Sequence, residues 1–134
     1  MEFKLHQKLE EDSIFILDLE LCQLRLINNA DYPWLILVPR LENIIEITDL
    51  TDTDYLLLNQ EIMLVSMFLK AYLQPDKLNI ATIGNVVSQM HVHIIARYKD
   101  DKTYPKTVWG NEFNRYSKNA ENDIINLIRK YLQK

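Results

Sequence analysis

Apolar and polar residues alternate along the chain between Asp12 and Asn28, a period-two pattern that is typical of half-buried β-strands. The short stretch Asp18–Glu20 interrupts the alternation and predicts a hairpin turn between two strands. After a loop at Asn28–Tyr32, the apolar run Pro33–Pro39 is bounded by prolines and is too short for a helix. We therefore expect three strands in this part of the chain.

From Thr51 onward the apolar residues recur at steps of three and four, which predicts the longest helix of the chain over Thr53–Tyr72. Thr51 and Thr53 are candidate N-caps, and Pro75 marks a point beyond which the helix cannot continue. The apolar face of this helix is wide enough to pack on a sheet. A second helix is predicted at the end of the chain, where one helical face collects Ile124, Ile125, Ile128, Tyr131 and Leu132.

Two further strands are predicted between these helices, at Leu78–Ile83 and Met90–Arg97, joined through Gly84. The stretch from Asp100 to Lys118 is polar and loop-like. The elements together predict an α+β fold with a mainly antiparallel five-stranded sheet, a long helix packed on it and a C-terminal helix. Because 134 residues show no repeat and no linker, we expect residues 1–134 to form a single domain.

The composition is that of an ordinary globular protein, with 48% hydrophobic and 25% charged residues. The net charge of -4 provides no global positive field to attract a polyanion, so nucleic acid is not an expected partner. A small phosphorylated ligand is compatible with this charge, because a pocket needs only a few local donors.

Signals for export or membrane insertion are not visible in the sequence. The single cysteine, Cys22, cannot form an internal disulfide, and residues 1–10 are charged where a signal peptide would be apolar. No uninterrupted apolar run reaches the length of about 18 residues that a spanning helix needs. We therefore expect a cytoplasmic protein with no membrane partner.

The candidate chemistry lies on the strand predicted at Met90–Arg97. Side chains alternate between the two faces of a strand, and consecutive residues on one face are about 7 Å apart at Cα. This alternation separates the apolar set Met90, Val92, Ile94 and Ala96 from the polar set Gln89, His91, His93 and Arg97. Such a polar face suits phosphoryl or nucleotidyl transfer, in which one imidazole attacks phosphorus while neighbouring donors hold its oxygens.

Two other interpretations of the His-x-His pair remain open on the residues alone. His91 and His93 can be two solvent-facing polar residues, or half of a metal site. For a metal site, His6 is the only further histidine, and no carboxylate stands at a close, regular spacing. We therefore predict no metal and no cofactor.

The segment Gln89-Met90-His91-Val92-His93-Ile94-Ile95 resembles the signature of the histidine triad (HIT) family, in which three histidines alternate with apolar residues on one strand. The resemblance covers most of the chain, because the apolar strand ending at Pro39-Arg40, the long helix, the strand at Asn79, the glycine turn and the motif strand occur in the family's order. It is similar in particular to a bacterial branch that has a Gln-x-His-x-His core, Asn-Val-Val before it and Pro-x-x-Val-Trp-Gly after it, here Pro105–Gly110.

The resemblance implies catalytic roles for three motif residues. His91 stands at the position of the nucleophile, and His93 stands at that of the histidine that touches the phosphate oxygens and the leaving group. Gln89 takes the place of the first histidine, whose backbone carbonyl orients the nucleophile in the family. Trp34 stands where the family has an auxiliary histidine on an earlier strand.

The resemblance also implies substrate contacts. Asn79 and Asn85 correspond to amides that contact phosphate, and Asn28 or Asn29 lies where an acidic residue usually binds the ribose. Arg97 is either a phosphate clamp or a surface charge at the strand end. Trp109 either lies near the active site of the neighbouring subunit, as the tail tryptophan of related proteins does, or is an ordinary packing residue. The predicted substrate-binding set is therefore Asn28, Asn29, Asn79, Gly84, Asn85, Arg97, Trp109 and Trp34.

The activity implied by the resemblance is nucleotidyl hydrolysis or transfer at the α-phosphate of nucleoside phosphoramidates or dinucleoside polyphosphates. It proceeds through a nucleotidyl-histidine intermediate in a homodimer that binds a small-molecule nucleotide. The replacements at Gln89 and Trp34 keep two alternatives open: a nucleotide-binding protein with little or no turnover, and a purely structural dimer module.

Overall fold

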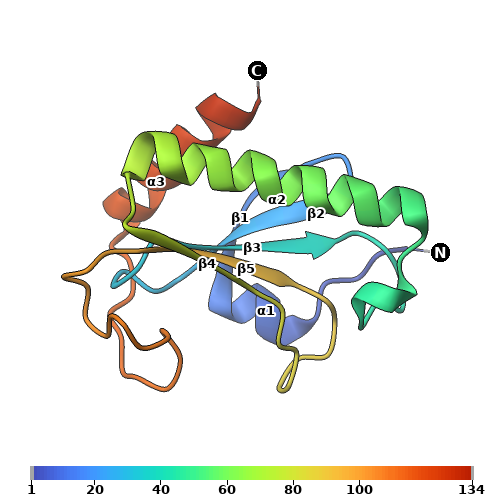
Figure 1. Cartoon of the computed structure of the whole chain (residues 1–134), viewed down its shortest axis with the longest axis horizontal. Coiled ribbons are helices and arrows are strands. Elements are labelled where there is room, and N and C mark those ends of the chain that lie inside the picture. Colours follow the sequence, from blue (N-terminus) through green and yellow to red (C-terminus); the bar gives the residue numbers. More distant parts are fainter. Residues whose placement is uncertain (1, 134) are drawn as a thin grey trace.

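The computed structural model describes residues 2–133 and shows one sheet flanked by helices on both faces (Figure 1). The elements in chain order are α1 (Gln7–Asp12), β1 (Ser13–Asp18), β2 (Cys22–Ile27), β3 (Trp34–Pro39), the 3-10 helix η1 (Ile47–Asp49), α2 (Asp52–Leu73), β4 (Lys77–Ala81), β5 (Val92–Arg97) and α3 (Lys118–Leu132).

The five strands form one sheet in the order β1-β2-β3-β5-β4, and every neighbouring pair is antiparallel. The α+β fold predicted from the sequence is confirmed, as are the hairpin between β1 and β2 and the long helix. Strand β5 lies between β3 and β4, so His93 is opposite Ile36 and Ile95 is opposite Trp34. This register places the motif strand in the interior of the sheet, where it is held on both sides.

Helices α2 and α3 cover one face of the sheet, and the short helix α1 lies on the other (Figure 1). The core under α2 and α3 takes the β5 side chains Val92 and Ile94, which pack with the buried helical residues Leu58, Val65, Phe68, Leu69, Ile125 and Ile128. A second cluster on the opposite face contains Ile95 and is completed by Leu9, Tyr32, Trp34, Ile36, Val38, Val87 and Val108. The predicted alternation of faces along β5 is thus present.

Local capping explains where α2 begins and ends. The Thr51 side chain accepts a hydrogen bond from the Asp54 backbone N–H at 3.1 Å, which makes Thr51 the N-cap of α2. The helix ends at Leu73, and its C-cap residue Gln74 adopts the left-handed conformation before Pro75. Helix α2 is long and apolar enough to span a membrane by length and composition, yet one of its faces is buried against the sheet.

Three local features differ from the sequence-based expectations. Helix α1 was not predicted, because six residues are too few for a helical period to appear. Strand β4 ends at Ala81 and β5 begins at Val92, so both are shorter than expected. The chain between them bends at Gly84, whose φ of 69° lies in the left-handed region. His91 is therefore the last residue of this loop, directly before β5.

Candidate active site

A cavity of about 630 Å³ is lined in part by α1, which lies on the face of the sheet opposite α2 and α3 (Figure 1). Its volume is in the range of small-molecule sites. Its walls come from α1, the end of β2 with the loop after it, the start of β3, β5 and the loops before and after β5. The lining residues are Lys8, Leu9, Asp12, Ile27, Asn29, Trp34, Ile83, Gly84, Asn85, Val86, Val87, His91, His93, Val108, Trp109, Gly110, Asn111, Phe113 and Arg115. Both motif histidines are among these residues.

His91 is held by a backbone carbonyl two residues before it. The ring atom Nδ1 lies 2.7 Å from the Gln89 carbonyl oxygen, and the residue is only 7% exposed. A carbonyl oxygen only accepts hydrogen bonds, so Nδ1 must donate. In the neutral ring the lone pair then belongs to Nε2, which is the tautomer that a nucleophilic imidazole needs.

His93 is held in the opposite way, by a tryptophan on the neighbouring strand. The indole Nε1–H of Trp34 donates to His93 Nδ1 at 2.9 Å. Because an indole N–H can only donate, Nδ1 of His93 is the acceptor and its hydrogen lies on Nε2. Burial, and to a smaller extent the neighbouring His91, lowers the pKa of His93 to about 4. His93 is therefore neutral in the physiological range and offers an N–H to a bound ligand.

Four of the rings that line this cavity pack against one another. The rings of His91 and His93 are 4.9 Å apart between centroids. Trp109 meets His93 edge-on at 5.1 Å and Trp34 edge-on at 5.4 Å. These contacts restrain the two imidazoles by packing as well as by hydrogen bonds, so their positions are set before any ligand binds.

The buried, neutral state of His93 predicts a specific dependence of stability on pH. In the unfolded chain His93 takes up a proton below about pH 6.5, whereas in the folded protein its pKa is about 4. The unfolded state thus binds more protons in this window, and the folded state loses stability as the pH falls through it, by up to about 3 kcal/mol. Urea unfolding at pH 7 and pH 4.5 measures the loss.

His93→Asn should remove most of this pH-dependent loss, because the group that takes up the proton is gone. His6→Asn is the matched control, since His6 is exposed and an asparagine preserves the acceptor that caps α1. An unchanged pH dependence in His93→Asn would contradict the assignment of a neutral, buried His93.

Of the predicted substrate-binding residues, five line the cavity: Asn29, Trp34, Gly84, Asn85 and Trp109. The left-handed backbone at Gly84 opens the loop that carries Asn85, and a side chain there would be strained. Asn29 is buried, and its Oδ1 accepts the Asp31 backbone N–H at 2.9 Å, so this side chain also shapes its own loop.

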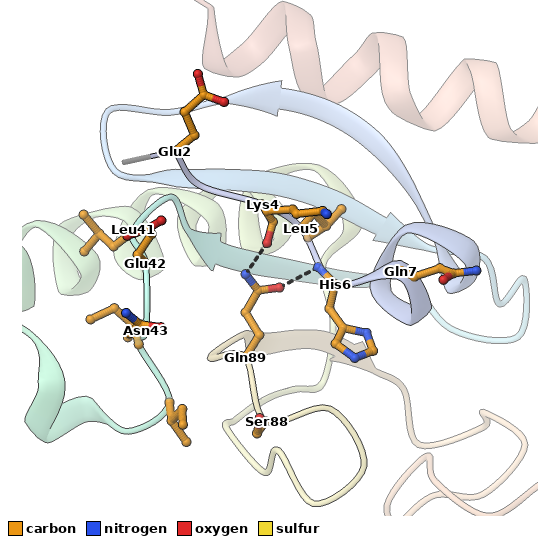
Figure 2. A pocket seen from close by; sticks show the side chains of 12 residues that line it. Glu2, Lys4, Leu5, His6, Gln7, Leu41, Glu42, Asn43, Ser88 and Gln89 are labelled. Atoms are coloured by element: carbon orange, nitrogen blue, oxygen red, sulfur yellow. Dashed lines mark hydrogen bonds between the residues drawn. The ribbon is translucent and has the colours of Figure 1, made fainter.

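Gln89 does not direct its side chain into this cavity, contrary to the predicted polar face. Figure 2 shows it in a separate pocket, where its amide is bonded to the N-terminal segment. Oε1 accepts the His6 backbone N–H at 2.8 Å, and Nε2 donates to the Lys4 carbonyl at 2.9 Å. Because Gln89 lies outside the regular strand, the period-two rule does not fix its direction. Only its carbonyl reaches His91.

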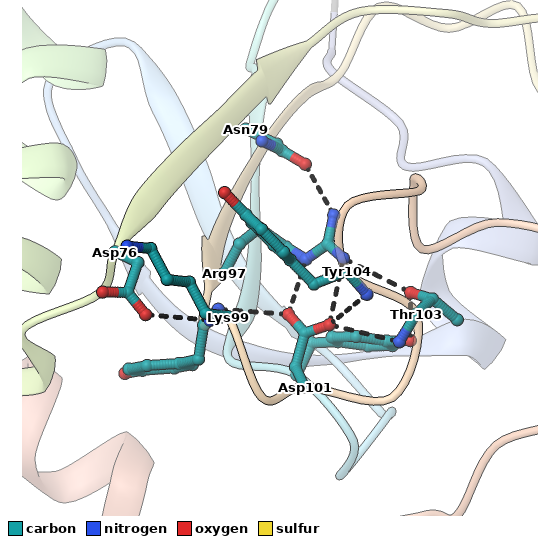
Figure 3. A network of polar contacts seen from close by, with 9 residues as sticks. Asp76, Asn79, Arg97, Lys99, Asp101, Thr103 and Tyr104 are labelled. Carbon is teal, nitrogen blue, oxygen red and sulfur yellow. Dashed lines mark hydrogen bonds and ion pairs between the residues drawn. The ribbon is translucent and has the colours of Figure 1, made fainter.

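Arg97 and Asn79 also lie outside the set of residues that line the cavity. Arg97 is therefore not a phosphate clamp of this cavity, and because it is buried it is not a surface charge either. Its guanidinium is buried and donates to Asp101 at 2.8 and 3.1 Å and to Asn79 Oδ1 at 2.8 Å (Figure 3). Asn28 is likewise occupied, since its Oδ1 accepts the Tyr116 backbone N–H at 3.0 Å. The side chains of Arg97, Asn79 and Asn28 therefore make hydrogen bonds within the fold and do not line the cavity.

Two cationic side chains at the cavity, Lys8 and Arg115, were not anticipated from the sequence. Lys8 pairs with Asp12 at 2.9 Å on α1. No motif or period in the sequence singles these residues out, because they reach the site through the folding of α1 and of the loop before α3. Both side chains carry a positive charge, and that of Lys8 is matched by Asp12, which also lines the cavity. Among residues 2–133, no three His, Cys, Asp or Glu side chains are grouped to hold a metal ion.

Comparison with known proteins identifies relatives over nearly the whole chain. The model of the HIT domain matches residues 8–100. A histidine triad protein from Bradyrhizobium japonicum has 41% identity and a TM-score of 0.96, with 98% of this chain and 99% of that chain covered. A histidine triad (HIT) protein from Sinorhizobium meliloti has 40% identity and a TM-score of 0.94, with 97% of each chain covered.

A third similar structure is that of a histidine triad protein from Marinobacter aquaeolei. It has 32% identity and a TM-score of 0.96, with 99% of this chain and 98% of that chain covered. Among curated proteins, no sequence matches this chain. The three structures agree with this chain in fold and in length.

Proposed function

Because this chain belongs to the HIT domain family, we propose that it is a nucleotidyl hydrolase or transferase in which His91 attacks the α-phosphate of a nucleotide substrate. The observation that carries the proposal is the hydrogen bond from His91 Nδ1 to the Gln89 carbonyl. This bond leaves Nε2 with its lone pair at the wall of a cavity of nucleotide size.

The residues around His91 suit the charge of the substrate. His93 Nε2–H donates to a non-bridging phosphate oxygen, and the Asn85 amide at the glycine turn offers a second donor. Lys8 and Arg115 add positive charge at the wall of the cavity. The apolar side chains Leu9, Ile27, Val87, Val108 and Phe113 give a nucleobase a surface to bury.

The proposed reaction has two steps. His91 Nε2 displaces the leaving group from the α-phosphorus and forms a nucleotidyl-His91 intermediate. Water, or another acceptor, then displaces His91 and releases the nucleoside monophosphate or its transfer product. The substrates that we propose are nucleoside phosphoramidates or dinucleoside polyphosphates, and no metal or cofactor takes part.

Intact-mass spectrometry after an acid quench tests this function. The protein is mixed separately with adenosine 5′-phosphoramidate and with a diadenosine polyphosphate. An adduct with the mass of one adenylyl group, together with free adenylate, is expected with at least one of the two compounds. Tight binding of both compounds without adduct or adenylate would identify a nucleotide-binding protein instead. Failure to bind either compound, with the fold intact, would leave only a structural module.

We further propose that the protein is a cytoplasmic homodimer. The outer face of α2 exposes Leu56, Met63 and Met67, which are 61%, 61% and 56% accessible. An apolar stripe on a helix is costly to leave in water, and a second copy would cover it. Cys22 is a buried free thiol, as suits a reducing compartment.

Sedimentation analysis checks the dimer. The unmodified protein is expected at twice the mass of the chain, and the double variant Met63→Glu with Met67→Glu is expected at the mass of one chain. Asn119→Glu adds a charge at an exposed site that belongs to α3 and not to α2, and it should leave the dimer intact. A single-chain mass for the unmodified protein would overturn this proposal.

A further inference from the structure

The two imidazoles of the site are held in opposite tautomers by partners with fixed hydrogen-bonding roles. The Gln89 carbonyl can only accept, so the hydrogen of His91 lies on Nδ1. The Trp34 indole can only donate, so the hydrogen of His93 lies on Nε2. The site thus presents one lone pair and one N–H to the ligand.

We propose that Trp34 is a positioning residue that keeps His93 a neutral hydrogen-bond donor. As a consequence, the site favours substrates whose leaving group departs as a stable anion, such as a phosphate or polyphosphate oxygen, over substrates with an amine leaving group. This inference rests on the proposed nucleotidyl transfer and narrows its substrate class.

The hydrogen bond from Trp34 opposes proton delivery by His93. To hand a proton to a leaving group and end neutral, His93 would first have to carry hydrogens on both ring nitrogens. The Nδ1 hydrogen would then face the indole N–H at a donor-acceptor distance of 2.9 Å, inside a site where His93 is 6% exposed. Two opposed donors in a buried site lose their hydrogen bond and both remain unsatisfied.

The other ionisable residues nearby do not replace His93 as an acid. Among the described residues that line the cavity, Lys8 carries an ammonium group, but its hydrogen bond to Asp12 raises its pKa above the ordinary lysine value. Asp12 is the partner in that ion pair. An amine leaves phosphorus only after it is protonated, whereas a phosphate oxygen leaves with the electron pair of the broken bond.

The reaction balances without a proton donor. In the first step the lone pair of His91 Nε2 forms the N–P bond, the P–O bond to the leaving group breaks, and its electron pair leaves on that oxygen. The Nδ1 hydrogen of His91 stays bonded to the Gln89 carbonyl. In the second step a water oxygen bonds to phosphorus, the N–P electron pair returns to Nε2, and the proton of the water passes to solvent.

Nitrogen NMR of the imidazoles tests the positioning role without any nucleotide. In the unmodified protein labelled with ¹⁵N-histidine, we expect a His93 Nδ1 signal typical of a bare nitrogen and a Nε2 signal typical of an N–H at pH 7. Trp34→Phe should replace this pattern with fast exchange between tautomers. Trp109→Phe is the matched control, because Trp109 packs on the same ring edge-on, and it should leave the pattern in place. A protonated Nδ1 in the unmodified protein would overturn the proposal.

Leaving-group dependence tests the substrate class. Single-turnover formation of adenylyl-His91 is followed with adenosine 5′-aryl phosphates made from phenols of decreasing acidity. We expect the rate to fall steeply, by more than about 10²-fold across the series, because general acid catalysis, which supplies about 10²–10⁴-fold, is absent. Trp34→His offers a group that exchanges protons with His93 Nδ1. This variant should therefore make the rate of adduct formation depend less on the acidity of the phenol.

The outcomes separate this inference from the proposed function. Equal rates for weakly and strongly acidic phenols in the unmodified protein show that a proton is delivered, and they overturn the leaving-group preference while supporting nucleotidyl transfer. No adduct with any ester, including the most acidic phenol, overturns nucleotidyl transfer and the leaving-group preference together. The NMR pattern decides the role of Trp34 in either case.

Discussion

Replacing His91 with alanine is expected to abolish release of nucleoside monophosphate, by a factor of about 10⁴ or more, which is the usual scale for loss of a nucleophile. Among the described residues that line the cavity, no other side chain carries an imidazole lone pair that faces it, because Trp34 occupies the acceptor nitrogen of His93. The steady-state rate of adenylate release measures the loss of turnover. Intact-mass spectrometry after an acid quench measures the loss of the covalent adduct.

Two controls make the His91→Ala result specific. His6→Asn changes the third histidine, which lies in the separate pocket of Figure 2, and should retain turnover. Free imidazole added to His91→Ala can enter the vacated space and should restore part of the adenylate release. Substantial activity of His91→Ala without added imidazole would show that another group attacks phosphorus.

The sequence was sufficient to predict the features that depend on local period. Alternation along β5 correctly sends Val92 and Ile94 to the helix-covered face and His93 to the other. The change of period at Thr51 correctly marks the start of α2. These features follow from side-chain direction along a strand or helix, which a few consecutive residues already determine.

Features that depend on partners far away in the chain could not be predicted from the sequence. The Gln89 amide is bonded to the backbone at Lys4 and His6, more than 80 residues earlier in the chain. A glutamine side chain carries both a donor and an acceptor, so its chemistry fits a catalytic face as well as a backbone clamp. Only the path of the N-terminal segment across this region decides between them. The same holds for Lys8, which reaches the cavity only because α1 folds under the sheet.

Arg97 shows how a strand-end cation can be structural instead of functional. Its side chain and that of Asp101 are 2% and 6% exposed, and Tyr32 and Tyr104 lie within 5.4 and 5.6 Å of the guanidinium. Burial alone would raise the pKa of Asp101. Hydrogen bonds from Arg97 and from three backbone N–H groups overcome this and lower it to about 2. The pair is therefore charged and fully engaged at neutral pH.

Asp101→Ala is accordingly expected to lower the free energy of unfolding by about 3–5 kcal/mol, because it leaves the buried Arg97 guanidinium without its counter-charge. Urea unfolding at pH 7 measures the loss.

Glu121→Ala is the matched control: it removes one partner of the more exposed pair with Lys118 and should cost at most about 1 kcal/mol. Because Arg97 also anchors Asn79 on β4 and the loop that leads to Trp109, Asp101→Ala should loosen the wall of the active site even where the protein remains folded. Equal, small losses for the two variants would show that Arg97 finds water when Asp101 is removed.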